Sequence, residues 1–261
     1  MNAVTYRLID THAHLDELDD LDTALERARQ AGIVAVIAVG QEYESNLRTL
    51  EIADRHRSLV YPALGLHPWS LGDMDGAAVE RNLGFLQENL GGAAALGEVG
   101  LDYHKRVTAA VAKERQKDVL RALLEIARAC NKPVSLHSRY AWKDGFDLVR
   151  ESGVKKVVFH WFTGFSSVLR DIIAEGYFVS ATPAAEYHDE HRRAVREVPL
   201  ENLLLETDTP VTYGRQTRFQ ATPADTVRSL EAVAVAKGLD RGLVAEKTTS
   251  SAAALFGLRL R

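Results

Sequence analysis

Short apolar runs alternate with longer amphipathic stretches along the whole chain, and this alternation is the feature that most constrains the fold. Each apolar run has the length of a buried strand, and each stretch between runs has the spacing of a helix that buries one face. The pattern therefore predicts βα units in a parallel sheet. Eight strands are expected, at residues 7–10, 33–39, 60–66, 93–97, 133–136, 156–159, 177–181 and 203–206.

The helices between these strands are recognisable from their apolar faces and from their ends. One such face consists of Val119, Leu120, Leu123, Leu124, Ala127 and Cys130. Gly32, Gly153 and Gly176 each follow an amphipathic stretch, which predicts a left-handed residue at the end of a helix. Eight units in 261 residues fit a (β/α)₈ TIM barrel, although a doubly wound open sheet has the same local pattern.

Composition excludes several classes of protein. With 46% hydrophobic and 26% charged residues, we expect a single globular domain over residues 1–261. No apolar run approaches the roughly 20 residues that span a bilayer, and the first residues lack the apolar core of a signal peptide, which predicts a cytoplasmic protein without a membrane partner. The only cysteine, Cys130, excludes an intramolecular disulfide and a cysteine zinc cage and is expected to fill the core.

The formal net charge of −4 gives no general attraction to nucleic acid. It does not exclude a phosphate substrate, because bound divalent cations can dominate the field of a site. Nothing in the sequence indicates an obligate protein partner.

Polar side chains that suit metal ions stand in or directly after the expected strands. The candidates are His12, His14, Glu98, His137, His160 and Asp208. His12 and His14 share one side of an extended chain, so two imidazoles can share one cation. Because parallel strands point their carboxyl ends to the same face of a barrel, we expect all six groups to converge there. Any one of the histidines alone is more simply explained as a hydrogen-bonded core residue, but six groups in register indicate a metal site.

The types of ligand limit which metal ions the site can bind. Imidazole and carboxylate together suit Zn²⁺, Mn²⁺, Fe²⁺ or Co²⁺, and Mg²⁺ is a further candidate. A carboxylate such as Glu98 can bridge two ions through its two oxygens. We therefore expect two divalent ions, whose identity stays open.

Six short motifs, in their order and placement, resemble the TatD family of metal-dependent hydrolases. They are Asp10-Thr11-His12-Ala13-His14-Leu15-Asp16, Gly65-Leu66-His67-Pro68, Gly97-Glu98-Val99-Gly100-Leu101-Asp102-Tyr103, Leu136-His137-Ser138-Arg139, His160-Trp161-Phe162-Thr163-Gly164 and Leu205-Glu206-Thr207-Asp208-Thr209-Pro210. The resemblance covers nearly the whole chain. It implies the barrel rather than the open sheet, and a deoxyribonuclease-like phosphodiesterase of the 3′–5′ exonuclease type that acts on DNA.

The resemblance also implies roles for the six groups. The residues that match His12, His14 and Asp208 hold one ion in TatD-like proteins, those that match His137 and His160 hold the other, and the match to Glu98 lies between the ions. Glu98 and Asp208 are therefore the expected catalytic residues. Asp208 is the candidate to accept a proton from the water that the two ions activate.

Five residues are candidates for substrate binding: His67, His104, Arg139, Arg215 and Arg218. His67 and His104 stand just past strand ends. Arg139 follows His137 by two residues and could present a bidentate donor to a phosphate, with a salt bridge at the barrel rim as the alternative.

Residues 209–224 contain Arg215 and Arg218 but no acidic residue, and Tyr213 and Phe219 are interleaved with the arginines. We expect this segment to stack a base and hold a phosphate, with a plain surface loop as the alternative. The segment departs from the family, because a glutamate that many TatD-like chains carry before the last helix is missing.

Other polar residues are expected to lie on the surface or to support the site. His56, His188 and His191 fall among charged neighbours and are expected on the solvated surface. Asp10 and Glu206 precede expected ligands by two residues, where they could orient an imidazole or only hydrogen-bond within the barrel.

Two alternative functions remain at this stage. The first is hydrolysis of another ester or an amide, such as deacylation of a D-aminoacyl-tRNA, on the same metal site. The second is a non-catalytic binding protein, against which the six intact ligands argue.

Overall fold

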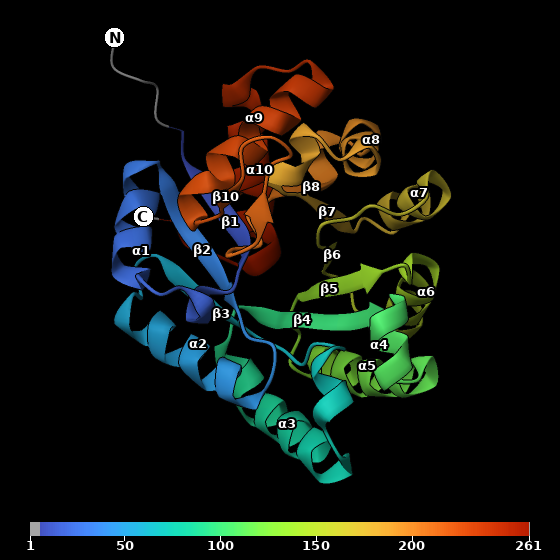
Figure 1. The fold of residues 1–261 in the computed structure, drawn as a ribbon. Coiled ribbons are helices and arrows are strands. Elements are labelled where there is room, and N and C mark those ends of the chain that lie inside the picture. Colours follow the sequence, from blue (N-terminus) through green and yellow to red (C-terminus); the bar gives the residue numbers. More distant parts are fainter. Residues whose placement is uncertain (1–5, 261) are drawn as a thin grey trace.

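The computed structural model describes residues 6–260, which form a barrel of parallel strands surrounded by helices (Figure 1). The strands follow one another around the sheet in chain order: β1 (Leu8–Ala13), β2 (Ile33–Val39), β3 (Val60–Leu64), β4 (Ala95–Asp102), β5 (Val134–Arg139), β6 (Val157–Phe159), β7 (Phe178–Ala181) and β8 (Leu203–Leu205). All neighbouring pairs are parallel. The (β/α)₈ barrel expected from the sequence is confirmed.

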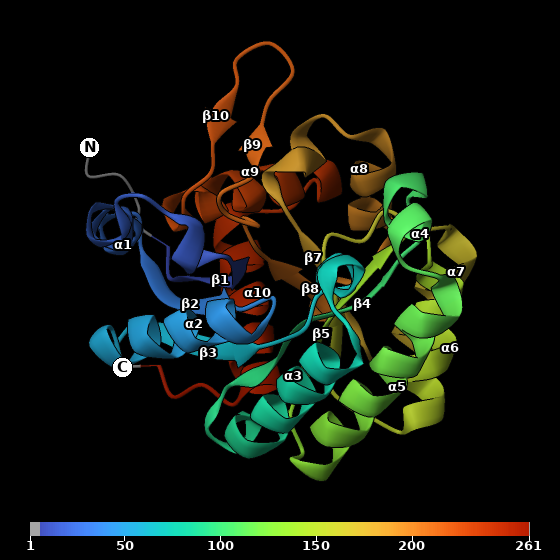
Figure 2. The ribbon, with the colours of Figure 1, turned by 60° about the horizontal axis from the view of Figure 1, so that its bottom comes forward.

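Helices cover the outside of the barrel (Figure 2). Those within the described residues are α1 (Leu21–Gln30), α2 (Tyr43–Arg55), α3 (Gly76–Asn89), α4 (Lys105–Ala110), α5 (Lys113–Ala129), α6 (Trp142–Ser152), α7 (Ser166–Ala174), α8 (Asp189–Glu197), α9 (Thr226–Lys237) and α10 (Arg241–Phe256). Gly32, Gly153 and Gly176 have φ of 90°, 76° and 74° at the ends of α1, α6 and α7, as predicted. Among the described residues, no helix combines the length and apolar character needed to cross a membrane.

Strand side chains alternate between two apolar layers. In β2, Val36 and Ala38 pack in the layer between strands and helices, whereas Ala35, Ile37 and Val39 belong to a second cluster inside the barrel. The last residues of α10 pack against this inner cluster. They line a cavity with the first residues of β3 and with residues just before β4 and β5, at the amino-terminal end of the barrel. In enzymes with this fold, the functional site lies at the opposite, carboxyl-terminal end of the strands.

The barrel closes between β1 and β8 through the residues that follow β8. The amide of Asp208 donates to the His12 carbonyl at 2.9 Å. Below this contact, the Asp10 carboxylate accepts hydrogen bonds from the Thr207 amide at 3.0 Å and the Thr207 hydroxyl at 2.6 Å. Burial raises the pKa of Asp10 to about 8. Asp10 thus joins the first strand to the last, which is the simpler of its two expected roles.

Strand bounds differ most from expectation where the site lies. β2 matches its expected range, but β1 ends at residue 13 instead of 10, β4 at 102 instead of 97, and β5 at 139 instead of 136. His12, Glu98 and His137 therefore lie within strands, and the expectation that Glu98 and His137 follow strand ends was wrong. Polar side chains can continue these strands because they satisfy one another at the mouth of the barrel.

The surface assignment was wrong for His191, which is buried. Its Nε2 accepts a hydrogen bond from the Thr182 amide at 3.1 Å, and its Nδ1 donates to the Phe162 carbonyl at 3.0 Å. Burial lowers the pKa of His191 to about 4. His188 is exposed, as expected, and caps α8, whereas His56 is partly buried. Cys130 is also partly buried and packs against the core.

Candidate metal centre

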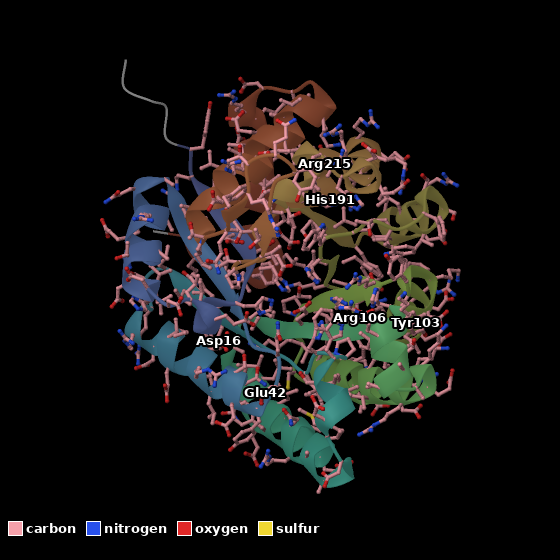
Figure 3. The ribbon with its side chains drawn as sticks, viewed as in Figure 1. Asp16, Glu42, Tyr103, Arg106, His191 and Arg215 are labelled. Atoms are coloured by element: carbon pink, nitrogen blue, oxygen red, sulfur yellow. The ribbon has the colours of Figure 1, made fainter. Side chains whose placement is uncertain are left out.

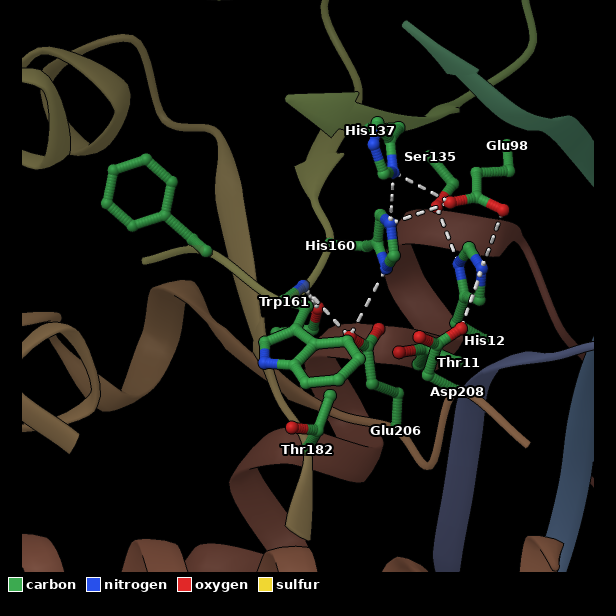
Figure 4. Close-up of polar contacts among 12 residues, drawn as sticks. Thr11, His12, Glu98, Ser135, His137, His160, Trp161, Thr182, Glu206 and Asp208 are labelled. Atoms are coloured by element: carbon green, nitrogen blue, oxygen red, sulfur yellow. Dashed lines mark hydrogen bonds and ion pairs between the residues drawn. The ribbon is translucent and has the colours of Figure 1, made fainter. Parts of the chain in front are cut away.

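The six predicted ligands meet at the carboxyl-terminal end of the barrel, where the two oxygens of Glu98 face the four histidines. Figure 4 labels five of the six: His12, Glu98, His137, His160 and Asp208. β1 contributes His12, β4 contributes Glu98, and β5 contributes His137. The other three residues follow strands: His14 directly after β1, His160 directly after β6 and Asp208 three residues after β8. Residues far apart in the sequence thus share one cluster, as the convergence of parallel strands predicts.

One oxygen of Glu98 faces the β1–β8 side of the cluster. Glu98 Oε2 lies 3.6 Å from His12 Nε2 and 3.3 Å from His14 Nε2. Asp208 Oδ1 lies 3.6 and 3.4 Å from the same two nitrogens. Two ligand atoms about 2.1 Å from one tetrahedral ion are roughly 3.4 Å apart. These four atoms therefore have the spacing of ligands that share one ion.

The other oxygen of Glu98 faces β5 and β6. Glu98 Oε1 lies 2.9 Å from both His137 Nδ1 and His160 Nε2, and these two nitrogens are 3.3 Å apart. A second group of donor atoms therefore surrounds this oxygen. One carboxylate separates the two groups, which is the arrangement of a bridging ligand.

The second ring nitrogen of an imidazole decides which nitrogen is free to bind a metal. His14 Nδ1 donates to the Val39 carbonyl at 3.1 Å, so Nε2 keeps its lone pair for the cluster. His137 Nε2 lies 3.1 Å from Asp102 Oδ2 and donates to this carboxylate, which leaves Nδ1 free. When both rings are neutral, as metal binding requires, the lone pair of each therefore points to the place where Glu98 lies.

Buried nitrogens without hydrogen bonds test whether the cluster fits a metal. Among the described residues, His12 Nε2 and His160 Nδ1 are buried and have no hydrogen-bond partner. His160 Nδ1 still lies 3.6 Å from Glu206 Oε1, whereas His12 Nε2 faces only the oxygens of Glu98 and Asp208, each 3.6 Å away. A buried polar atom without a partner is costly. A divalent cation would satisfy His12 and both carboxylates, so these residues fit the metal.

The charges of the cluster are strongly coupled. Burial alone would raise the pKa of Glu98, but His67 and His160 hold it well below its usual value. Burial, followed by the repulsion of His160, lowers the pKa of His12, which favours the neutral imidazole that a metal requires. For His14, hydrogen bonds with Asp208 and Glu98 outweigh burial and raise the pKa. Without a metal, protons on the imidazoles balance the two carboxylates.

His67 is near the cluster but differs from the other histidines. Within residues 6–260, three groups have ligand atoms within 4.8 Å of one another: His12, His14 and Asp208; His12, His160 and Glu206; and His67, Glu98 and His137. Spacing alone would therefore admit His67 as a ligand. However, His67 Nδ1 accepts a hydrogen bond from the Trp69 amide at 3.2 Å, which places the proton on Nε2. That nitrogen lies 3.3 Å from Glu98 Oε1 and acts there as a donor.

Asp102 is a site residue that sequence reasoning noted only as part of a motif. Its Oδ2 accepts hydrogen bonds from His137 Nε2 and, at 2.6 Å, from Trp69 Nε1. Burial raises the pKa of Asp102, but these donors outweigh it and lower the pKa to about 2. The alternation of β4 offered a signal, because a residue four positions after Glu98 faces the same side of a strand.

Gly100 allows β4 to come close enough to β5 for these contacts. It has a φ of 150°, and a Cβ at this position would lie 1.9 Å from the His137 carbonyl oxygen. Only glycine fits such an approach. The close approach places Glu98 and Asp102 on the two nitrogens of the His137 ring.

Two of the candidate substrate residues, His104 and Arg139, line one cavity of about 560 Å³ together with Trp69. His104 lies at the start of α4, and Arg139 is the last residue of β5. Within residues 6–260, Arg139 forms no ion pair. Its guanidinium instead lies 5.6 Å from the centre of the Tyr140 ring. The alternative of a rim salt bridge for Arg139 is therefore not supported.

The segment after Asp208 folds differently from the expectation. It forms a hairpin of β9 (Thr212–Tyr213) and β10 (Phe219–Gln220) that projects from the barrel (Figure 2). Tyr213 is buried, and its hydroxyl donates to the Thr207 carbonyl at 2.8 Å. The Arg228 guanidinium covers the Phe219 ring at 3.9 Å. The expected base-stacking role of this aromatic pair is therefore wrong, because one ring is buried and the other is covered.

Arg215 and Arg218 remain exposed on the hairpin. Figure 3 shows Arg215 away from Arg106 of α4. The Arg215 guanidinium lies 5.8 Å from the centre of the Tyr187 ring. The structure shows no direct contact of either arginine with the six-residue cluster.

A (β/α)₈ barrel with histidines and carboxylates at its carboxyl-terminal end is the architecture of a metal-dependent hydrolase. The family model described as TatD related DNase matches residues 9–257. The human deoxyribonuclease TATDN3 is 33% identical over 271 residues, covering 98% of this chain and 97% of the relative. The uncharacterised metal-dependent hydrolase YabD of Bacillus subtilis is 30% identical, covering 95% and 98%. The crystal structure of the TatD homologue YJJV from Escherichia coli K12 superposes with a TM-score of 0.87 at 27% identity, covering 98% and 100%.

The chain therefore belongs to the TatD family and is a metal-dependent hydrolase.

Proposed function

We propose that the chain is a deoxyribonuclease-like phosphodiesterase of the 3′–5′ exonuclease type that uses two divalent ions. In this proposal one ion is held by His12, His14 and Asp208. The second is held by His137 and His160, and Glu98 contacts both ions. Zn²⁺, Mn²⁺, Fe²⁺ and Mg²⁺ are the candidate ions.

One observation carries the proposal. Donor nitrogens lie 3.3 to 3.6 Å from one oxygen of Glu98 and 2.9 Å from the other. The relative TATDN3 is named a deoxyribonuclease, which supports DNA as the substrate. The 3′–5′ direction rests on the family resemblance alone.

The residues of the chain then have separate tasks. When bound, divalent ions lower the pKa of water from 15.7 towards about 7 and offset the charge of a phosphate. Asp208 accepts the proton of the attacking water, because its Oδ1 faces the cluster. His67 donates its Nε2 proton to Glu98 Oε1, 3.3 Å away, and so positions this carboxylate. Arg139 binds a phosphate at the rim.

The test is hydrolysis of a 5′-labelled single-stranded DNA by purified protein of measured metal content. We expect a ladder that shortens from the 3′ end, stops with a chelator and returns when metal is restored. The Glu98→Gln protein, purified in the same way, controls for a contaminating nuclease. Activity that persists without metal, or release of amino acid from D-aminoacyl-tRNA with no cleavage of DNA, would contradict the proposal.

A further inference from the structure

A row of aromatic rings follows one side of the barrel mouth, and we name it the rim strip. It consists of Trp69, His104, Tyr140, Trp142 and Phe165. These residues follow β3, β4, β5 and β6, which are neighbours in the barrel, so their loops follow one another around the mouth.

Neighbouring rings of the rim strip contact one another. The rings of His104 and Tyr140 are stacked, with centroids 6.1 Å apart and 24° between their planes. Tyr140 meets the edge of Trp142 at 5.8 Å, and Trp142 meets Phe165 at 5.3 Å. Four of the five rings therefore form a continuous series, and Trp69 lies beside His104 in the lining of one cavity.

Three rings of the rim strip are open to solvent, whereas His104 and Trp142 are partly buried. Trp69 is 53% exposed, Tyr140 56% and Phe165 68%. The other large apolar side chains exposed among residues 6–260 are aliphatic: Val235, Leu239 and Leu243. Exposed rings gathered on one surface indicate a binding site, because each ring could gain free energy by covering its face.

Cationic side chains border the same surface. Lys105, Arg106 and Arg139 line the cavity of about 560 Å³ that Trp69 and His104 also line. All three are exposed, and within residues 6–260 none of them forms an ion pair. Figure 3 shows Arg106 on α4. The chain as a whole has a net charge of −4, so this local concentration of positive charge does not follow from composition.

The rim strip is connected to the metal centre through Asp102. One oxygen of Asp102 accepts a hydrogen bond from Trp69 Nε1 at 2.6 Å and from His137 Nε2 at 3.1 Å. A ligand on the strip therefore lies beside the expected second metal. This contact distinguishes the strip from the hairpin, whose arginines do not contact the cluster.

We propose that the rim strip binds single-stranded DNA. Its bases stack on the rings, and its phosphates pair with Lys105, Arg106 and Arg139, so that one end of the strand reaches the metal centre. Stacking on a protein ring requires a base whose face is free, which a single strand offers and a duplex does not. This inference rests on the proposed function and adds the surface that holds the strand.

The experiment measures the affinity for a fluorescein-labelled dT₁₂ by anisotropy, in EDTA, so that binding is separated from cleavage. Loss of one stacking ring weakens single-strand binding by about tenfold, which we expect for Phe165→Ala and for Tyr140→Leu. Tyr140→Phe keeps a ring and should bind like the parent. Val235→Ala is the control for loss of an exposed apolar side chain on another face.

The cations are tested by salt dependence. Each phosphate contact of a single strand contributes about 0.7 to the slope of log affinity against log salt concentration. The double variant Lys105→Ala/Arg106→Ala should therefore reduce the slope by about 1.4. Lys155→Ala/Lys156→Ala removes the same charge from exposed residues just before β6, at the opposite end of the barrel, and should leave the slope unchanged.

Three results would overturn the inference: no binding of dT₁₂ by the parent, equal weakening by strip and control variants, or equally tight binding of a blunt duplex. Hydrolysis of bis(4-nitrophenyl) phosphate by the metal-loaded parent tests the proposed function separately. A protein that hydrolyses this small diester but fails the binding tests refutes the rim strip alone. A protein that passes the binding tests but hydrolyses no diester refutes the proposed function alone.

Discussion

The two sides of Glu98 differ in charge and in their position relative to the cavity. On the β1–β8 side, two imidazoles face Asp208 and one oxygen of Glu98. On the β5–β6 side, imidazoles surround the other oxygen of Glu98 alone. The first side has more negative charge for a cation, and the second side lies towards the cavity and the rim strip.

The supports of the two sides differ as well. His14 is held by a backbone carbonyl of β2, whereas His137 is oriented by the carboxylate of Asp102. His160 Nδ1 lies 3.6 Å from a carboxylate oxygen of Glu206. Carboxylate partners increase the basicity of a ligand imidazole. In the proposed two-ion site, we expect the first side to retain its ion through its own ligands and the second side to depend on neighbouring carboxylates for affinity. The following predictions test this distinction.

The largest effect is expected from Asp208→Asn, on the first side. The amide keeps the size and one oxygen of the side chain but cannot accept the proton of the attacking water. Loss of a general base lowers kcat by roughly 10²–10⁴-fold. The measurement is kcat together with metal content in the same preparation. Turnover equal to the parent at full metal occupancy would exclude Asp208 as the base.

Glu98→Gln tests whether Glu98 contributes to metal binding on both of its sides. The variant has one carbonyl oxygen where the parent has two anionic oxygens, so both groups of donors lose a charge. We expect kcat to fall by more than the roughly 100-fold that loss of an outer partner costs. Metal analysis should show weakened binding of both ions. Full retention of one ion would show that Glu98 serves a single side.

Asp102→Asn should weaken the second side alone. Without the negative charge beside Nε2, His137 is a poorer ligand, and metal affinity falls by roughly 10- to 100-fold. Titration of activity with metal measures this loss. Because the variant retains all six expected ligands, kcat should recover at saturating metal. A kcat that stays low at saturation, with unchanged metal affinity, would contradict the positioning role.

His191 should affect stability and not chemistry, because it joins the loop after β6 to the residue after β7. Its folded pKa of about 4 lies below the ordinary value of 6.5, so the unfolded chain binds the proton more tightly. Stability is therefore lost as pH falls from 6.5 towards 4, by about 2 kcal/mol at pH 5. Urea unfolding at pH 7.5 and 5.0 measures the change.

The matched variant is His191→Gln, whose amide can still accept from Thr182 and donate to Phe162. It should lose less stability on acidification than the parent. The metal-site histidines titrate in both proteins, so their contribution drops out when the two losses of stability are subtracted. The same acid sensitivity in both proteins would assign it to other groups.

Much of the barrel was predictable because its signals are local. The apolar runs and the glycines that end α1, α6 and α7 depend on nearest neighbours along the chain. The ends of β4 and β5 were not predictable in this way. Their polar residues are typical of loops. They remain in strands only because side chains from other strands supply their hydrogen-bond partners.

The candidate site shows the same division. The types of the six polar side chains and their order predicted a cluster, but not which oxygen of Glu98 faces which histidine. Asp102 gained its role from the approach of β4 to β5 at Gly100. The sequence favoured base stacking on the hairpin, whereas we propose it for the rim strip. The sequence could not show that Tyr213 is buried and Phe219 covered, because both are tertiary effects.

By itself the sequence determined the alternation of strands and helices and the chemistry of the six polar groups, because hydrophobic spacing and side-chain type are written residue by residue. Only the tertiary structure decided the tautomers of the imidazoles, the two sides of Glu98 and the open face of the rim strip. These features depend on distances between residues as far apart as His12 and Asp208, and such distances exist only once the barrel has closed.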